Sequence, residues 1–225
     1  MDIIIKKIIR SKRKTIALQV CDDATLIIKA PLFAGNDVIN EIIRKHDKWL
    51  EKKKKEILSR NLNIVEKKFV NGERFLYLGK LYPLKVIQNN DIKYPLFFNN
   101  GCFCLNGNIS NRRDVFVSWY KQAAKVKFMQ RAEWYAEITG YRYNKMGISN
   151  AHRQWGSCTH LGNIYFSWRL IMSPLSIIDY IIVHELVHLD EKNHSRFFWD
   201  KVRLIMPDYK DKRKWLRNYG HLLKI

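Results

Sequence analysis

The pattern of hydrophobic and polar positions in the first half of the chain predicts a small sheet interrupted by one helix. Alternating runs over residues 15–30 predict a β-hairpin with its turn at residues 21–24. Apolar residues then recur at three- and four-residue intervals and predict a helix over residues 36–58. Two more strand pairs are expected, one over residues 75–86 joined at Gly79-Lys80, and one turning around residues 99–101.

In the second half the spacing becomes mainly helical. Asn111 is a candidate N-cap for a long helix that Gly140 would end. Strands are expected near residues 145–152 and 164–170, and more helices follow. We therefore expect an α+β protein: a β-rich N-terminal part with an inserted helix at residues 1–108, and a compact second part at residues 109–225.

A helix expected after Ser173 and Pro174 carries the motif H-E-x-x-H, from His184 to His188, within an apolar run. Two residues four positions apart on a helix differ by about 40° of rotation and about 6 Å of rise, so both imidazoles can reach one metal ion. Glu185 lies about 100° round from His184, where its carboxylate can meet a water molecule on that metal. The pattern is typical of a zinc hydrolase.

A catalytic zinc usually has three protein ligands and one open position, so a third ligand is expected. His194 is the first candidate. Because a straight helix would place it about 9 Å beyond His188, the helix must end between the two. Asn193 is the candidate left-handed C-cap for that break. Asp200, a carboxylate on the next expected helix, is the alternative third ligand. We expect one zinc ion per chain.

Composition restricts the class of protein. The 225 residues are 47% hydrophobic and 28% charged, which indicates a soluble globular chain without a membrane span. No signal-peptide pattern is recognised at the start, so a cytoplasmic location is expected. The four cysteines, at positions 21, 102, 104 and 158, are too thinly spread for a disulfide framework. The formal charge of +20 favours attraction to polyanions such as nucleic acid, although lysine-rich solvated surfaces explain such a charge equally well.

Several motifs extend beyond H-E-x-x-H: W-G-S-C at residues 155–158, W-R-L at residues 168–170, H-E-L-x-H-L at residues 184–189 and N-H-S at residues 193–195. With these motifs the chain resembles the YgjP-like metallopeptidases, relatives of the SprT and WLM zinc proteases. The resemblance covers nearly the whole chain. It implies an N-terminal β-rich part that leads into a compact catalytic part of the zincin type.

The resemblance also implies zinc-ligand roles for His184, His188 and His194 and a general-base role for Glu185. Two positions depart from the family pattern. Gln154 stands directly before the W-G-S-C tryptophan, where the family usually has arginine, and Ser167 stands where it usually has asparagine. An anion-binding or strand-edge role of these two positions is therefore not supported in this chain.

The leading hypothesis is a cytoplasmic zinc metallopeptidase that acts on peptide or protein substrates, with Glu185 as the general base for metal-activated water. Residues 164–168 are the candidate strand for holding an extended peptide by main-chain hydrogen bonds. A further group must stabilise the oxyanion of the transition state. The candidates for this or another substrate contact are His152, Arg153, Arg169 and Tyr180.

Two alternatives remain open. One is a metal-dependent nucleotide pyrophosphatase or phosphohydrolase, because the positive charge would attract a triphosphate. The chain lacks a P-loop, and this absence makes the hypothesis weaker than the peptidase hypothesis. The other is a nucleic-acid-associated protein with SprT-like protease activity or with a metal that is only structural. Net charge alone supports it, and steep salt dependence of binding would identify it.

Overall fold

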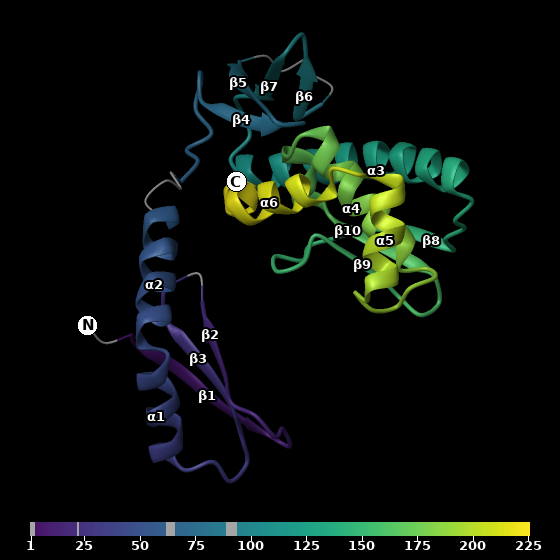
Figure 1. The fold of residues 1–225 in the computed structure, drawn as a ribbon. Helices are drawn as coiled ribbons and strands as arrows, with labels where there is room; N and C mark the ends of the chain where they lie inside the picture. Colours follow the sequence, from purple (N-terminus) through teal and green to yellow (C-terminus); the bar gives the residue numbers. More distant parts are fainter. Residues whose placement is uncertain (1–2, 22, 62–65, 89–93) are drawn as a thin grey trace. The chain divides into compact units, whose positions relative to one another are not determined.

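The computed structural model describes residues 3–21, 23–61, 66–88 and 94–225. Strands and helices are mixed along the chain, and the expected α+β class is confirmed (Figure 1). The chain forms two compact units, Met1–Val65 and Glu66–Ile225, whereas the sequence suggests a division at residue 108. Each unit has a hydrophobic core of its own.

The first unit is a three-stranded sheet with two helices. Its strands lie in the order β1-β3-β2, with β1 parallel and β2 antiparallel to β3. Leu26 and Ile28 of β3 are fully buried and share a core with Ile39 and Leu50 of the helices. The elements are β1 (Ile5–Ser11), β2 (Ala17–Val20), β3 (Leu26–Pro31), α1 (Asn36–Lys45) and α2 (Asp47–Asn61).

Two expectations for this unit can be compared with the structure. The β2–β3 hairpin is confirmed; its expected turn at residues 21–24 includes residue 22, which lies outside the described residues. The single helix expected over residues 36–58 is wrong, because His46 ends α1 and α2 begins at the next residue. Asp47 in the first turn of α2 suits a new helix start, since a carboxylate is favoured beside helix N-termini.

The second unit begins with a four-stranded sheet in the order β4-β5-β7-β6. The turn between β4 and β5 lies at Leu78 and Gly79, one residue earlier than expected, and both have positive φ. The amide of Leu78 donates to the carbonyl of Ile171 at 2.8 Å, and a Cβ on Gly79 would lie 2.8 Å from Pro174 Cγ. The turn therefore packs against the start of the helix that carries H-E-x-x-H. The strands are β4 (Arg74–Tyr77), β5 (Lys80–Ile87), β6 (Leu96–Asn99) and β7 (Cys102–Asn106).

The long helix α3 (Arg112–Thr139) connects this sheet to the rest of the unit. As expected, Asn111 caps it by accepting a hydrogen bond from the Asp114 amide, and Gly140 ends it at a φ of 76°. Phe116 and Tyr120 pack against the aromatic side chains of the sheet, while Phe128 packs on Phe166 further along the unit. The four-stranded sheet and the helices thus share one core.

A second, three-stranded sheet and a buried helix complete the interior. The strands β8 (Lys145–Ser149), β9 (Gly156–Cys158) and β10 (Asn163–Ser167) lie in the order β8-β10-β9. The strand expected to reach residue 170 stops at Ser167 and continues as a short 3-10 helix, η1 (Trp168–Met172). Helix α4 (Leu175–Val187) is apolar almost all round, as befits a helix buried on several sides, and packs against α3, α5, α6, β9 and η1.

The end of the chain forms α5 (Arg196–Ile205), α6 (Tyr209–Tyr219) and the short η2 (Gly220–Leu222). Ser195 caps α5 by accepting a hydrogen bond from the Phe198 amide at 3.4 Å. Both α5 and α6 pack on α4 (Figure 1). The expected cap of α4 is wrong by one residue: Pro174 is the N-cap, because the Ser173 hydroxyl instead donates to the carbonyl of Leu170 at 2.7 Å.

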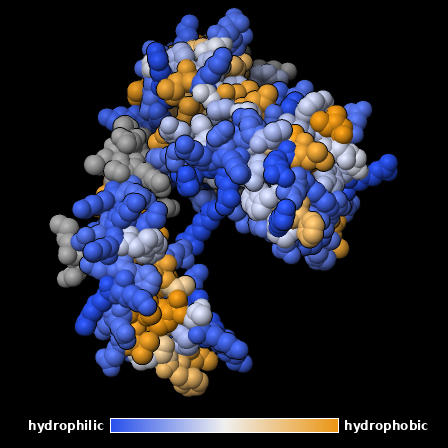
Figure 2. Space-filling view, viewed as in Figure 1, coloured by the Kyte–Doolittle hydropathy of each residue, from blue (hydrophilic) through white to orange (hydrophobic). Residues whose placement is uncertain are grey.

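The visible surface is mostly hydrophilic, with smaller hydrophobic areas (Figure 2). This agrees with a sequence of 41 lysines and arginines against 21 acidic residues. None of the described helices combines the length and the apolar composition needed to cross a membrane.

Candidate metal centre

The structure brings the three histidines that the sequence singles out together at one point. The Nε2 atom of His194 lies 3.0 Å from Nε2 of His184 and 3.2 Å from Nε2 of His188. One nitrogen from each ring lies within 4.8 Å of the others. His184 is on the last turn of α4 and His188 is its C-cap, whereas His194 comes back from the turn before α5.

The surroundings of His184 and His188 favour their neutral imidazoles. Burial, followed by the charges of His188 and His194, lowers the pKa of His184 to about 3. Burial also lowers the pKa of His188, and the Nδ1 atom of this ring lies 2.8 Å from the carbonyl oxygen of Glu191. Because a carbonyl only accepts, Nδ1 carries the proton, and the lone pair of Nε2 points toward the cluster.

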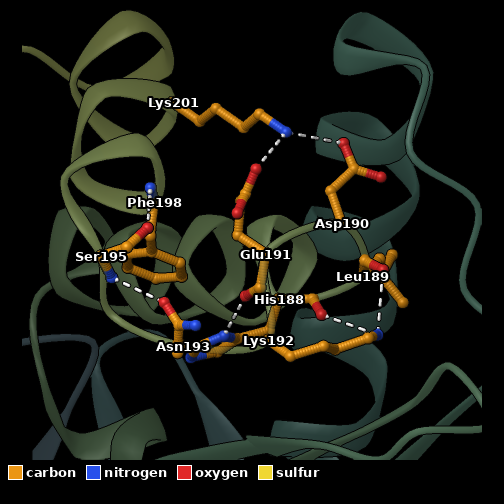
Figure 3. A network of polar contacts seen from close by, with 9 residues as sticks. All are labelled: His188, Leu189, Asp190, Glu191, Lys192, Asn193, Ser195, Phe198 and Lys201. Carbon is orange, nitrogen blue, oxygen red and sulfur yellow. Dashed lines mark hydrogen bonds and ion pairs between the residues drawn. The ribbon is translucent and has the colours of Figure 1, made fainter.

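The turn from His188 to His194 is held by polar contacts that Figure 3 draws. The Lys192 ammonium donates to the carbonyls of His188 and Leu189, both at 2.9 Å, and so satisfies the end of α4. The side chain of Lys201 on α5 pairs with Glu191 at 2.9 Å and with Asp190 at 3.3 Å. The turn is thereby tied at its start and in its middle.

The role expected for Asn193 in this turn is wrong. Asn193 does not have the left-handed conformation of a C-cap; its side-chain oxygen accepts a hydrogen bond from the Ser195 amide at 3.0 Å. The helix ends instead through tight bonds from Leu189 to the carbonyl of Leu186 and from Asp190 to that of Val187. Since Lys192 caps the remaining carbonyls, no left-handed residue is needed.

Glu185 is buried between α4 and β9, with 4% of its surface exposed. Burial raises the pKa of its carboxyl group to about 8. Gly156 of β9 makes room for it, because a Cβ at that position would lie 2.6 Å from Glu185 Cγ and overlap the carboxylate. The glycine of the W-G-S-C motif therefore has a steric role beside the H-E-x-x-H helix.

Two aromatic side chains of α5 form a wall of the cluster. Phe198 contacts all three imidazoles, with ring centroids 4.5 to 4.9 Å apart. Trp199 stacks on His194 at 5.6 Å and lies 5.8 Å from His184. These rings cover one side of the cluster.

Sequence reasoning did not single out Arg213 of α6, which lies next to this wall. Its guanidinium carbon is 5.0 Å from the Trp199 ring centroid. Burial raises the pKa of Tyr180 to about 12. The positive charge of Arg213 acts in the opposite direction and offsets part of this rise in the pKa of Tyr180. Arg213 is one of several cations in a basic stretch of sequence, and no spacing rule distinguishes it from the others.

The candidates for oxyanion or substrate contacts lie in different places. Tyr180 is buried on α4, and its ring lies 6.0 Å from that of His184. Arg169 and His152 are brought together, with Nη2 and Nε2 3.0 Å apart, and the Arg169 guanidinium also lies over Trp168 at 4.4 Å. Arg153 is exposed in the segment before β9. Tyr180 is therefore the candidate with a described ring contact to the cluster.

The alternative third ligand, Asp200, is engaged elsewhere on α5. Its carboxylate pairs with Arg203 at 2.9 Å and with Arg196 at 3.6 Å. His194 rather than Asp200 completes the group of three convergent nitrogens.

The prediction of which strand holds a peptide is wrong. That expectation fell on residues 164–168, but β10 is the central strand of its sheet and pairs with β8 on one side and β9 on the other. Its main-chain groups are therefore engaged. In the three-stranded sheet the strand next to α4 is β9, which is at the edge.

Comparison with known protein families agrees with these features. A family model described as "YgjP-like, metallopeptidase domain" matches residues 14–219. No curated protein matches the chain. Among solved structures, the chain is similar to the metallopeptidase zymogen abylysin of Pyrococcus abyssi, with 22% identity, a TM-score of 0.38, and coverage of 43% of this chain and 96% of that one.

Proposed function

The chain belongs to the YgjP-like metallopeptidase family, and from this premise we propose that it is a zinc-dependent peptidase in which His184, His188 and His194 bind the metal and Glu185 is the general base. The observation that supports this proposal best is the convergence of three imidazole nitrogens at one point. Next to His184 in the sequence stands Glu185, whose carboxylate is buried. The substrate class that follows is a peptide or protein.

The residues fit a zinc ion. Neutral imidazole is a preferred zinc ligand, and two nitrogens bound tetrahedrally at about 2.0–2.1 Å would be about 3.3 Å apart. The two shortest nitrogen distances in the cluster are 3.0 and 3.2 Å. When bound at such a site, zinc polarises a carbonyl group and lowers the pKa of water from about 16 to about 7.

The protein side chains supply the proton transfers. In its ionised form, Glu185 is placed to accept a proton from the attacking water and to pass it to the leaving amine. Its burial between α4 and β9 limits exchange of this proton with bulk water. Tyr180, one helical turn before His184, is the candidate hydrogen-bond donor to the oxyanion.

The edge position of β9 suggests how a substrate is held. An extended peptide can add to a free strand edge by main-chain hydrogen bonds, and β9 is the edge strand that packs on α4. A peptide on β9 would run past Glu185, because Gly156 and Glu185 are in contact. We assign the peptide-binding edge to β9 on these grounds.

Substitution of Glu185 by Gln tests the proposed mechanism. Glutamine has the same size but cannot take the proton, so peptide hydrolysis should fall about 10²- to 10⁴-fold while zinc content is unchanged. Glu137→Gln, an exposed position on α3, is the matched control and should have the turnover of the wild type. Undiminished hydrolysis by Glu185→Gln would exclude Glu185 as the base.

A further inference from the structure

Arg213, a cation of the second unit, lies next to the aromatic wall of the candidate metal centre. The Arg213 guanidinium lies over the ring of Trp199, and Trp199 in turn stacks on His194 and approaches His184. Tyr209 stacks on Trp199 at 5.2 Å with an interplanar angle of 16°, which fixes the ring that carries the guanidinium. Arg213 therefore contacts an aromatic ring that borders the cluster and that Tyr209 holds from another side.

No ion pair joins Arg213 to a carboxylate of the described residues, whereas some other cations of α5 and α6 have such a partner. Lys212, the residue before it, pairs with Asp208 at 2.6 Å, and Arg203 pairs with Asp200. Lys201 pairs with Glu191 and Asp190. Arg213 is exposed and forms a contact with Trp199 instead. Its guanidinium donors are thus available to a group from outside the chain.

The Arg213 guanidinium and a metal cation in the cluster would repel each other, and an anion placed beside both charges would reduce that repulsion. A carboxylate is such an anion and matches the planar fork of the guanidinium with two parallel hydrogen bonds. Because Arg213 is exposed, its guanidinium N–H groups can form such a pair while the guanidinium carbon stays over the Trp199 ring.

We propose that Arg213, held on Trp199, is a specificity-determining residue that binds a carboxylate group of the peptide substrate beside the metal centre. This proposal rests on the peptidase function proposed above. The carboxylate is either an acidic side chain of the substrate or its C-terminal carboxylate. In both cases the enzyme prefers a substrate with a negative charge at one defined position.

The test measures binding rather than turnover. Zinc-loaded Glu185→Gln protein is titrated with rhodamine-labelled hexapeptides and the Kd is read from fluorescence anisotropy. One series places Glu or Gln at each of the six positions of an alanine-rich peptide with an amidated C-terminus. A second pair compares a free with an amidated C-terminus. The expected result is binding about tenfold tighter for the charged member at one position, or for the free C-terminus.

Three further substitutions, each in the Glu185→Gln protein, assign this preference to one side chain. Arg213→Gln should abolish the tenfold difference, whereas Arg213→Lys, which keeps the charge but not the fork, should retain part of it. Arg217→Gln is the matched control, since it removes an exposed arginine from the same helix, and the difference should remain. Zinc content is measured for each protein.

The proposal is overturned if neither an internal position nor the free C-terminus favours the charged peptide, or if Arg213→Gln keeps the tenfold difference. It is also overturned if Arg217→Gln removes the difference equally, which would indicate net charge alone. Failure of the proposed function gives a different signal. If Glu185→Gln protein cleaves the peptides at the wild-type rate, the base assignment fails, and the charge preference is then read from kcat/KM of the same peptide pairs.

Discussion

Gly156 and Glu185 are the pair of residues on which the geometry of the site depends most closely. A single Cβ at position 156 would occupy the space of the Glu185 carboxylate. Glu185 is buried where α4 packs on β9, and its carboxylate lies against Gly156.

Gly156→Ala should therefore lower peptide hydrolysis about 10²-fold or more, because the added methyl group displaces Glu185, the proposed general base. The three histidines are not touched by this change, so zinc content should be unchanged. Steady-state hydrolysis and elemental analysis of the same sample check both points.

Gly35→Ala is the matched control for this prediction. A Cβ at Gly35 meets no atom within 4 Å, and this residue has a negative φ, so hydrolysis should be that of the wild type. If Gly156→Ala has full activity, the carboxylate does not need the position that the structure gives it.

For individual residues, the sequence predicts the positions that depend on local helical geometry. The positions of His184 and His188 follow from the spacing within one helix, and the structure places both rings at one point. The contact of Arg213 with Trp199 could not be predicted, because it depends on how α6 packs on α5. Likewise, Asn193 has the residue type of a left-handed cap, but Lys192 performs the capping through its ammonium group.

Among the elements, α4 is the one around which the second unit is built, and an ion pair ties it to α3. Arg131 of α3 donates to both carboxylate oxygens of Asp179 on α4, at 2.6 and 2.8 Å. The two side chains are only 22% and 12% exposed, and the Arg131 guanidinium also lies 4.6 Å from the Trp134 ring. The pair thus fixes the helix that carries His184 and Glu185.

Asp179→Asn should destabilise the protein by about 2 kcal/mol, because it leaves the largely buried guanidinium of Arg131 without its counter-charge. Urea-induced unfolding of the zinc-loaded protein measures this loss. Asp200→Asn is the control: its pair with Arg203 is 43% and 64% exposed, so the cost should be below about 1 kcal/mol. Equal costs for the two substitutions would show that the α3–α4 pair does not stabilise the fold.

The order of the elements could be predicted better than their pairing. Alternation and helical spacing predict the α3 helix and its caps, since both signals are local. They do not predict that β10 lies between β8 and β9, because the partner of a strand is decided by contacts distant in sequence. The sequence does not predict the change from β10 to the 3-10 helix η1 for a related reason. Trp168 and the apolar residues 170–172 suit a buried strand as well as a buried helix. Their packing against α3 and α4 selects the helix.

For the molecule as a whole, each of the two units has a separate hydrophobic core. The strands at residues 74–106 are part of the core of the second unit, although the strand pattern along the chain predicts that they belong to an N-terminal β-rich part. Alternating strands look the same whichever core they cover, so sequence reasoning could not assign them. The net charge of +20 does not distinguish a nucleic-acid partner from a solvated surface, and association with nucleic acid stays a prediction, as does the cytoplasmic location.

The central claim is that the second unit holds one zinc ion between three histidines. The measurement that tests it most directly is the metal content of the purified protein, by elemental analysis, beside that of His194→Ala and Asp200→Asn. We expect about one zinc per chain in the wild type and in Asp200→Asn, and a sharp reduction in His194→Ala, because the remaining two imidazoles cannot complete the site. Full zinc content without His194, or its loss with Asp200, would contradict the three-histidine site.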